Sequence, residues 1–338
     1  KKIYYITAVF ATLFLVGCGD GIDLPGVNVE TDLNKIPLPD NNVNLEQVEL
    51  KPSTEPMLHE GLHTEEDFQR IRDKKAAGEE PWVSAYQLLV ESQFSQKTAD
   101  TYPTEWIKRG VSGDENYMNA ARGATIVYQQ ALRWKIEQDD EYAAKAVENL
   151  NKWVQTCVGV TGNTNLSLAA GLYGYEFAIA GELLRDYGGW DRADFAAFQN
   201  WLLKVFYPAN DDFLKRHHDT NALHYWANWC LCNIAAKMAI GIVTDRRDIY
   251  NEGIAHLQTG DTNGRLRRAI YHDYAPDYNF AQWQESGRDQ GHTLMCVGLM
   301  GVICQLAWSQ GDDFFAYDDN LFLRACEYAA CCNYTNET

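Results

Sequence analysis

Residues 114–156 read DENYMNAARGATIVYQQALRWKIEQDDEYAAKAVENLNKWVQT. Apolar side chains recur at three- and four-residue spacing in two runs, 114–137 and 140–156, which is the period of an amphipathic helix. Only the polar pair Gln138-Asp139 separates the two runs. The stretch therefore predicts two antiparallel helices that pack as a hairpin.

The same pattern fills most of the chain on either side of this hairpin. Further helices are expected at 64–77, 81–94, 166–187, 191–206, 219–241, 245–259, 286–310 and 320–333. Their connections are short and rich in Gly, Asp and Asn, and no run alternates with period two for long enough to predict a strand. Because no fixed-length repeat is visible, we expect an all-α fold of the (α/α) toroid type, an incomplete barrel of antiparallel helix hairpins with a central cleft.

The N-terminus has the pattern of a bacterial lipoprotein signal. Lys1-Lys2 precede an apolar run that is too short for a stable membrane span, and the run ends at Leu15-Val16-Gly17-Cys18. We expect a lipoprotein signal peptide over 1–18, lipidation at Cys18 and export to the bacterial cell envelope, either to the periplasm or to the outer-membrane surface. An ordinary secretory signal with a chance cysteine is the alternative.

The rest of the chain divides into two parts. Residues 19–57 are rich in Pro, Asn and Asp without a helical period, which predicts a flexible tether. Residues 58–338 form the expected toroid domain. Because its last helical pattern runs up to the final residues, we expect this domain to be truncated at its C-terminus.

Composition excludes some kinds of partner. The net charge of −18 argues against a nucleic-acid partner, which needs a basic surface. The cysteines and histidines lack the spacing of a metal site, so no cofactor or metal is expected to be required. A structural calcium ion at Asp312-Asp313 or Asp318-Asp319 stays open.

The most reactive group of side chains lies in QWQESGRDQGHT, residues 282–293. On the helix expected here, Glu285, Arg288 and His292 would share one face. An acid, a permanent cation and an imidazole together suit the binding of an anionic substrate and the movement of its protons. The alternative is a buried structural ion pair between Glu285 and Arg288. The aromatic, non-helical stretch 265–283 is a candidate binding loop.

Two further clusters are candidates for the site. In HHDTNALHYWANW, residues 217–229, a helix would place Asn221, His224, Tyr225 and Asn228 on one face or its edges, which favours a site over a core. The second cluster, around Tyr173, either lines a cleft or packs closely against another helix.

Three motifs carry a family resemblance. HYWANW (224–229), QWQESGRDQGH (282–292) and AWSQGDDFFAYDDN (307–320) resemble the alginate-lyase superfamily of polysaccharide lyases, and most of all polysaccharide lyase family thirty-eight. The resemblance implies an (α/α) toroid that cleaves an acidic polysaccharide such as glucuronan or alginate. The implied reaction is β-elimination without a redox cofactor, which leaves a 4,5-unsaturated uronate end.

The resemblance also implies roles for individual residues. Asn221 and Arg288 would neutralise the uronate carboxylate, His224 would remove the C5 proton, and Tyr278 or else Tyr274 would protonate the leaving oxygen. Substrate contacts are expected from Gln284, Glu285, His292, Tyr225, Asn228, Trp229, Tyr173 and His272. The chain departs from the better-known alginate lyases because Ala222, and not histidine, follows Asn221.

Two other functions are kept as alternatives. A glycoside hydrolase on the same toroid would need two carboxylates flanking one bond. A surface glycan-binding lipoprotein without catalysis would need exposed aromatic side chains but no group of catalytic residues.

Overall fold

The computed structural model describes residues 55–334. The predicted signal peptide, Cys18 and nearly all of the tether therefore lie outside the described residues. The helices are α2 (Glu65–Ala76), α3 (Trp82–Glu91), α4 (Tyr117–Glu137), α5 (Asp140–Thr156), α6 (Leu166–Leu183), α7 (Arg192–Val205), α8 (Tyr207–Arg216), η3 (His217–Asp219), α9 (Ala227–Val243), α10 (Arg247–Thr259), α11 (Leu266–Ala269), α12 (Gln290–Ser309) and α13 (Tyr317–Tyr334).

The predicted hairpin is confirmed as α4 and α5. Gln138 ends α4 in the left-handed conformation, with φ of 58°, which turns the chain out of the helix. Asp139 then caps α5 by accepting a hydrogen bond from the backbone N–H of Glu141. The apolar sides of both helices are buried, with Leu150 and Trp153 fully covered.

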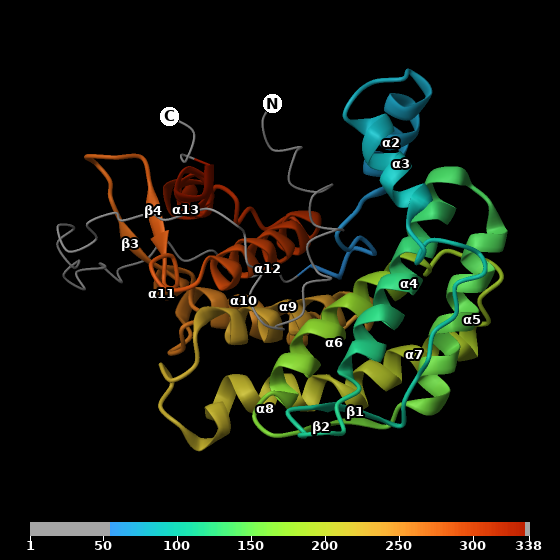
Figure 1. Cartoon of the computed structure of the whole chain (residues 1–338), viewed down its shortest axis with the longest axis horizontal. Coiled ribbons are helices and arrows are strands. Elements are labelled where there is room, and N and C mark those ends of the chain that lie inside the picture. Colours follow the sequence, from blue (N-terminus) through green and yellow to red (C-terminus); the bar gives the residue numbers. More distant parts are fainter. Residues whose placement is uncertain (1–54, 335–338) are drawn as a thin grey trace.

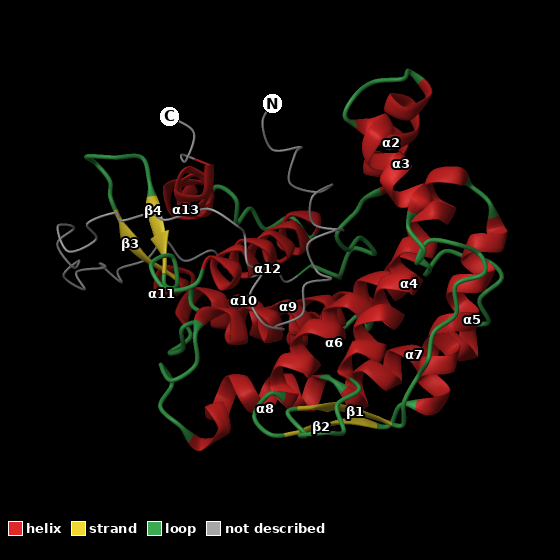
Figure 2. Cartoon of the chain, viewed as in Figure 1, coloured by secondary structure: helices red, strands yellow, loops and turns green. Residues whose placement is uncertain are grey.

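The helices form an inner row and an outer row, as Figure 1 shows. In the inner row, α4 packs on α6, α6 on α9 and α9 on α12. In the outer row, α5, α7, α8, α10 and α13 cover these helices, and Figure 2 shows how little of the chain is strand. Helices α6 and α9 are buried along nearly their whole lengths, which fits an inner position. The predicted (α/α) toroid is confirmed.

Two predicted helix starts are wrong. The helix expected from residue 219 begins only at Ala227, because His217, His218 and Asp219 all have positive φ angles, which a right-handed helix does not contain. The helix expected from residue 286 begins at Gln290. Asp289 is its N-cap, since its side chain accepts a hydrogen bond from the backbone N–H of His292.

Four short strands were not predicted. They are β1 (Trp106–Arg109), β2 (Gly159–Gly162), β3 (Ile270–Asp273) and β4 (Ala281–Trp283). β1 pairs with β2 in parallel, and β3 pairs with β4 as an antiparallel hairpin. Strands of three or four residues are too short for a period of two to be visible in the sequence.

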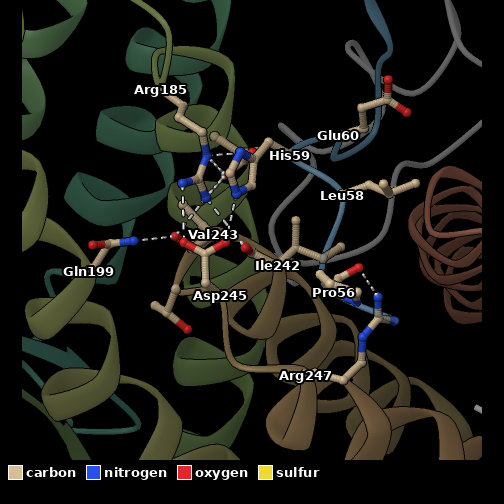
Figure 3. A network of polar contacts seen from close by, with 12 residues as sticks. Pro56, Leu58, His59, Glu60, Arg185, Gln199, Ile242, Val243, Asp245 and Arg247 are labelled. Atoms are coloured by element: carbon tan, nitrogen blue, oxygen red, sulfur yellow. Dashed lines mark hydrogen bonds and ion pairs between the residues drawn. The ribbon is translucent and has the colours of Figure 1, made fainter. Parts of the chain in front are cut away.

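Residues 56–64, which we call the N-terminal strap, cross the C-terminal ends of the inner helices (Figure 3). Gln310, just after α12, accepts a hydrogen bond from the Leu58 N–H at 2.8 Å and donates one to the Leu58 carbonyl at 2.9 Å. His59 Nε2 lies 2.8 Å from Asp245 Oδ1, just after α9. The strap therefore ties together the ends of α9 and α12.

Candidate active site

The N-terminal end of α9 is held against the turn that precedes α12. Gln284 Oε1 accepts a hydrogen bond from the Ala227 N–H at 3.2 Å, and Gln284 Nε2 donates to Asn263 Oδ1 at 2.9 Å. Asn263 Nδ2 in turn donates to the Tyr225 carbonyl at 2.8 Å. This chain of amide contacts brings together the two segments that the sequence analysis singled out. Both ends of the Gln284 amide, predicted to contact the substrate, are therefore used in contacts within the protein.

Arg288 joins the two segments through its side chain. Its guanidinium lies 5.0 Å from the centre of the Trp226 ring, a cation–π distance, and its side chain is 51% exposed. On the other side it forms an ion pair with Glu285, whose side chain is only 1% exposed and whose Oε2 is buried without a partner. The alternative interpretation, an ion pair between Glu285 and Arg288, is therefore correct, but about half of the Arg288 side chain is still exposed to solvent.

The predicted helical face of Glu285, Arg288 and His292 is wrong. The first two residues lie in a turn, where the Arg288 N–H donates to the Glu285 carbonyl at 2.9 Å, and His292 alone lies on α12. The turn still keeps Glu285 and Arg288 together, because residues three apart lie side by side in such a turn as they do in a helix. His292 Nδ1 lies 2.7 Å from Asp289 Oδ2, and its hydrogen bonds hold the pKa of Asp289 below its ordinary value.

The second predicted face is also wrong, because Asn221, His224 and Tyr225 lie in the loop before α9. Asn221 Oδ1 accepts a hydrogen bond from the Leu223 N–H at 2.8 Å, which is an Asx turn. The His224 N–H donates to the Asn221 carbonyl at 2.9 Å. Asn221 and His224 are both exposed, so this loop presents an amide and an imidazole to solvent next to Trp226.

Four of the predicted contact residues are more enclosed. Tyr225 is 9% exposed, with its ring 4.9 Å from that of His224 and 4.7 Å from that of Trp229, itself partly buried. Asn228 is 2% exposed, and its Oδ1 is buried without a partner. Tyr173 is buried in α6. These side chains form the floor of the region more than its open surface.

The aromatic residues of the β3–β4 hairpin lie elsewhere. Tyr274 donates a hydrogen bond to Gln282 Oε1 at 2.7 Å, and its ring packs on Tyr328 of α13 and on His272. Tyr278 is 66% exposed at the open end of the hairpin. Within residues 55–334, no hydrogen bond, ion pair or ring contact joins these three predicted residues to the loop that carries His224.

Metal ligands are not gathered anywhere in the described part of the chain. No group of three or more His, Cys, Asp or Glu side chains there is placed to hold a metal ion. The aspartates considered for calcium have protein partners: Asp312 accepts a hydrogen bond from the Tyr250 hydroxyl at 2.8 Å, and Asp318 forms an ion pair with Arg267.

The sequence analysis gave no role to Arg109, which the structure places at this same end of the inner row. Arg109 ends β1 and lies over the ring of Tyr117, the first residue of α4, at 4.7 Å. It is 6% exposed, and its Nη1 is buried without a partner. The available signal was the position of Arg109 in WIKR, two residues after the apolar Ile107 and therefore on the same face of a strand.

Comparisons with known proteins agree with this architecture. The family model for alginate lyase matches residues 71–336. Alginate lyase A1-III from Sphingomonas species A1 is similar in structure with a TM-score of 0.57, at 13% identity over 82% of this chain and 80% of that chain. An alginate lyase from Bacteroides ovatus has a TM-score of 0.57, at 14% identity over 82% and 83%.

A variant of alginate lyase A1-III complexed with a tetrasaccharide has a TM-score of 0.61, at 14% identity over 79% of this chain and 76% of that chain. No curated protein sequence matches this chain. The solved structures show the shared fold, and the family match covers most of the chain. The chain belongs to the alginate lyase family and is a polysaccharide lyase built on an (α/α) toroid.

Proposed function

We propose that this lyase cleaves a uronate-containing polysaccharide, such as glucuronan or an alginate-like chain, by β-elimination. The observation that carries the proposal is the half-exposed Arg288 side chain, whose guanidinium lies over Trp226, two residues from the exposed His224. A guanidinium binds a carboxylate, an aromatic ring packs against a sugar, and an imidazole accepts a proton near neutral pH. The three groups that such a substrate requires are therefore neighbours.

The reaction removes the proton on C5 of the uronate and breaks the bond between C4 and the glycosidic oxygen. The electron pair of the C5–H bond forms the C4=C5 double bond, and the leaving oxygen takes up a proton. Neutralising the uronate carboxylate stabilises the negative charge that develops beside C5. We assign this task to Arg288 with Asn221, whose amide lies in the same exposed loop as His224.

His224 is our choice for the base because it is exposed and adjacent to Trp226. The proton donor is a tyrosine, and ring contact favours Tyr225 over the two hairpin tyrosines. Tyr225 lies against His224, whereas Tyr274 packs on His272 and Tyr328. Comparing Tyr225→Phe with Tyr278→Phe tests this choice, since the donor's variant should lose far more kcat than the other.

The activity assay is direct. Purified protein is incubated with glucuronan, alginate and other uronans, and the ultraviolet absorbance of the conjugated C4=C5 double bond is followed. Absorbance should rise with at least one uronan, and the better substrate decides between the glucuronan and alginate assignments. Reducing ends without this absorbance would indicate hydrolysis, and binding without either product would indicate a glycan-binding protein.

The base is tested by His224→Ala, which should lower kcat by about 10²–10⁴-fold if His224 transfers the proton. The matched control is His59→Ala, which removes a histidine from the strap at the opposite ends of the inner helices. Normal turnover by His224→Ala would remove the assignment, as would an equal loss in both variants.

We also propose that the protein is exported and anchored through a lipid on Cys18, which its N-terminal sequence supports. The strap lies at the C-terminal ends of α9 and α12, and Trp226 and Arg288 lie at their N-terminal ends. Radiolabelled fatty acid should enter the wild type but not Cys18→Ser.

A further inference from the structure

We propose that Arg109 is a second carboxylate-binding residue, which holds a uronate unit of the same polysaccharide chain beside the unit held by Arg288. The inference rests on the proposed function, because it assumes a polyuronate substrate. It concerns a residue that neither the motifs nor the candidate catalytic group include.

Arg109 is directed inward by the strand that carries it. In β1, Trp106 is exposed, Ile107 is fully buried, Lys108 is partly exposed and Arg109 is buried, so Ile107 and Arg109 share the inner face. β1 lies beside β2, which leads into the first turn of α6, and Arg109 itself covers Tyr117 at the start of α4. The guanidinium is thus enclosed at the N-terminal ends of two inner helices, where helix dipoles favour an anion.

No carboxylate in the described part of the chain forms an ion pair with this guanidinium. Of the two acids closest to it in sequence, Asp114 binds Lys108 Nζ at 2.5 Å, and Glu115 accepts a hydrogen bond from the Gly110 N–H at 2.6 Å. Among residues 55–334, Arg109 has no ion pair and no side-chain hydrogen bond, and the ring of Tyr117 is its recorded contact.

Other buried arginines in the described chain show what a structural role looks like. Arg133 forms an ion pair with Glu137, and Arg324 forms one with Asp273. Arg265 has no ion pair either; burial and the nearby Arg268 lower its pKa, and Tyr317 and Asp261 only partly oppose that fall. An aromatic ring stabilises a cation by much less than burial costs it, so Tyr117 does not replace a carboxylate.

The two cations lie on either side of the start of α9. Cys232 is in the second turn of α9, where burial raises the pKa of its thiol and the positive charge of Arg109 partly opposes that rise. The first residue of α9, Ala227, binds Gln284, which belongs to the turn that carries Arg288. A polyuronate lying across this end of the inner row would present successive carboxylates to Arg109 and to Arg288.

The experiment compares Arg109→Met with Arg109→Lys and with Lys108→Met. The last variant removes one positive charge from the same strand but from its opposite face. We measure kcat/KM on a long uronan and on oligosaccharides of increasing length, together with Tm. Arg109→Met should lower kcat/KM on the long uronan by about 10–100-fold, chiefly through KM, since it removes a charge-assisted contact with the substrate.

Substrate length separates binding from folding. The shortest cleaved oligosaccharide cannot reach both cations, so Arg109→Met should change its kcat/KM by less than about threefold. Arg109→Lys should retain part of the activity on the long chain, Lys108→Met nearly all of it, and Arg109→Met should keep the wild-type Tm or exceed it. Unchanged kcat/KM in Arg109→Met, or an equal loss at every length with a lower Tm, would overturn the inference.

The proposed function can fail separately. If the wild type forms no unsaturated product from any uronan, elimination is wrong, and calorimetric titration of the same uronans into wild type and Arg109→Met then decides the inference. Weaker binding by Arg109→Met would support it, whereas equal binding or no binding by either protein would overturn it.

Discussion

The two ends of α6 carry enclosed arginines with opposite surroundings. At the C-terminal end, Arg185 donates to both oxygens of Glu182, at 2.7 to 3.0 Å. It also donates to the Val243 carbonyl at 2.9 Å (Figure 3). Asp245 lies 3.4 Å from it. At the N-terminal end, Arg109 lies over the ring of Tyr117 and forms no ion pair with any acid among residues 55–334.

The difference separates fold from function. A buried cation that is paired on every side stabilises the junction of two helices and is lost only at great cost. A buried cation without a partner destabilises the free protein unless a ligand supplies the missing charge. At the end of the inner row that holds Arg109, Asn228 Oδ1 and Glu285 Oε2 are also buried without partners. The toroid therefore provides hydrogen-bond and ion-pair partners for Arg185 at one end. At the other end it leaves Arg109 Nη1, Asn228 Oδ1 and Glu285 Oε2 buried without partners.

The largest expected effect comes from removing Arg185, the arginine that has partners in the protein. Arg185→Met should lower the free energy of unfolding by about 3–5 kcal/mol, because it leaves Glu182 buried without its partner. The loss should be smaller at about pH 6 than at about pH 9, because at the lower pH Glu182 of the variant takes up a proton and no longer carries a buried, unpaired charge. Urea denaturation measures it, with Arg109→Met as the comparison variant, which should lose little or nothing. Equal losses in the two variants would end the contrast between the arginines.

The second prediction concerns Glu176, an acid of α6 whose Oε2 is buried without a partner. Burial raises the pKa of Glu176 to about 8 from its ordinary value of 4.5. The unfolded chain loses this proton near its ordinary pKa while the folded protein keeps it, so stability from this group falls as pH rises from 4.5 to about 8. Glu176→Gln should therefore be more stable than wild type at about pH 8, by roughly 4 kcal/mol, and similar to it at about pH 4.

Denaturation curves across this pH range measure the Glu176 effect. Glu148→Gln is the control, because Glu148 is exposed and its lysine partners lower its pKa. A pH dependence of stability that is the same in wild type and Glu176→Gln would show that the carboxyl is not buried as an acid.

The third prediction concerns the strap. Gln310→Leu removes three hydrogen bonds to strap backbone, two with Leu58 and one with the Glu60 carbonyl, and leaves those groups unpaired. Unfolding free energy should fall by about 1–3 kcal/mol with kcat/KM unchanged. Gln305→Leu, one turn earlier on α12, is the control. A loss of activity without a loss of stability would link the strap to the site.

The smallest expected effect concerns Trp226, which lies at the end of the inner row that holds Arg288. Trp226→Ala should raise KM about twofold to fivefold, because it removes an exposed ring that packs on Arg288 in the proposed substrate site. Its Tm should hardly change, since the ring is 42% exposed. Trp308→Ala removes a similarly exposed tryptophan at the other end of α12 and should leave KM as it is. Equal KM values in the two variants would exclude Trp226 from substrate binding.

The sequence was sufficient to predict most of the helices and to select the two polar segments, 217–229 and 282–293, that meet in the structure. The helical period located α4 and α5 closely, because apolar residues on one face record burial directly. It failed at the starts of α9 and α12. There, positive φ angles and an N-cap set where the helix begins, and the polarity pattern of the side chains does not reveal them. Asn221, His224, Glu285 and Arg288 were therefore assigned to helical faces that do not exist, although their segments do meet.

The sequence by itself determined that the chain would form a helical toroid, since the helical period follows from which side chains occur at which spacing, and it singled out two polar segments as candidates for the site. The tertiary structure alone decided which charges have partners. Asp114 and Glu115 follow Arg109 closely in the chain, yet each binds another group. Whether a cation is neutralised depends on distances between atoms, and these are fixed only when strands and helices from distant parts of the chain have packed together.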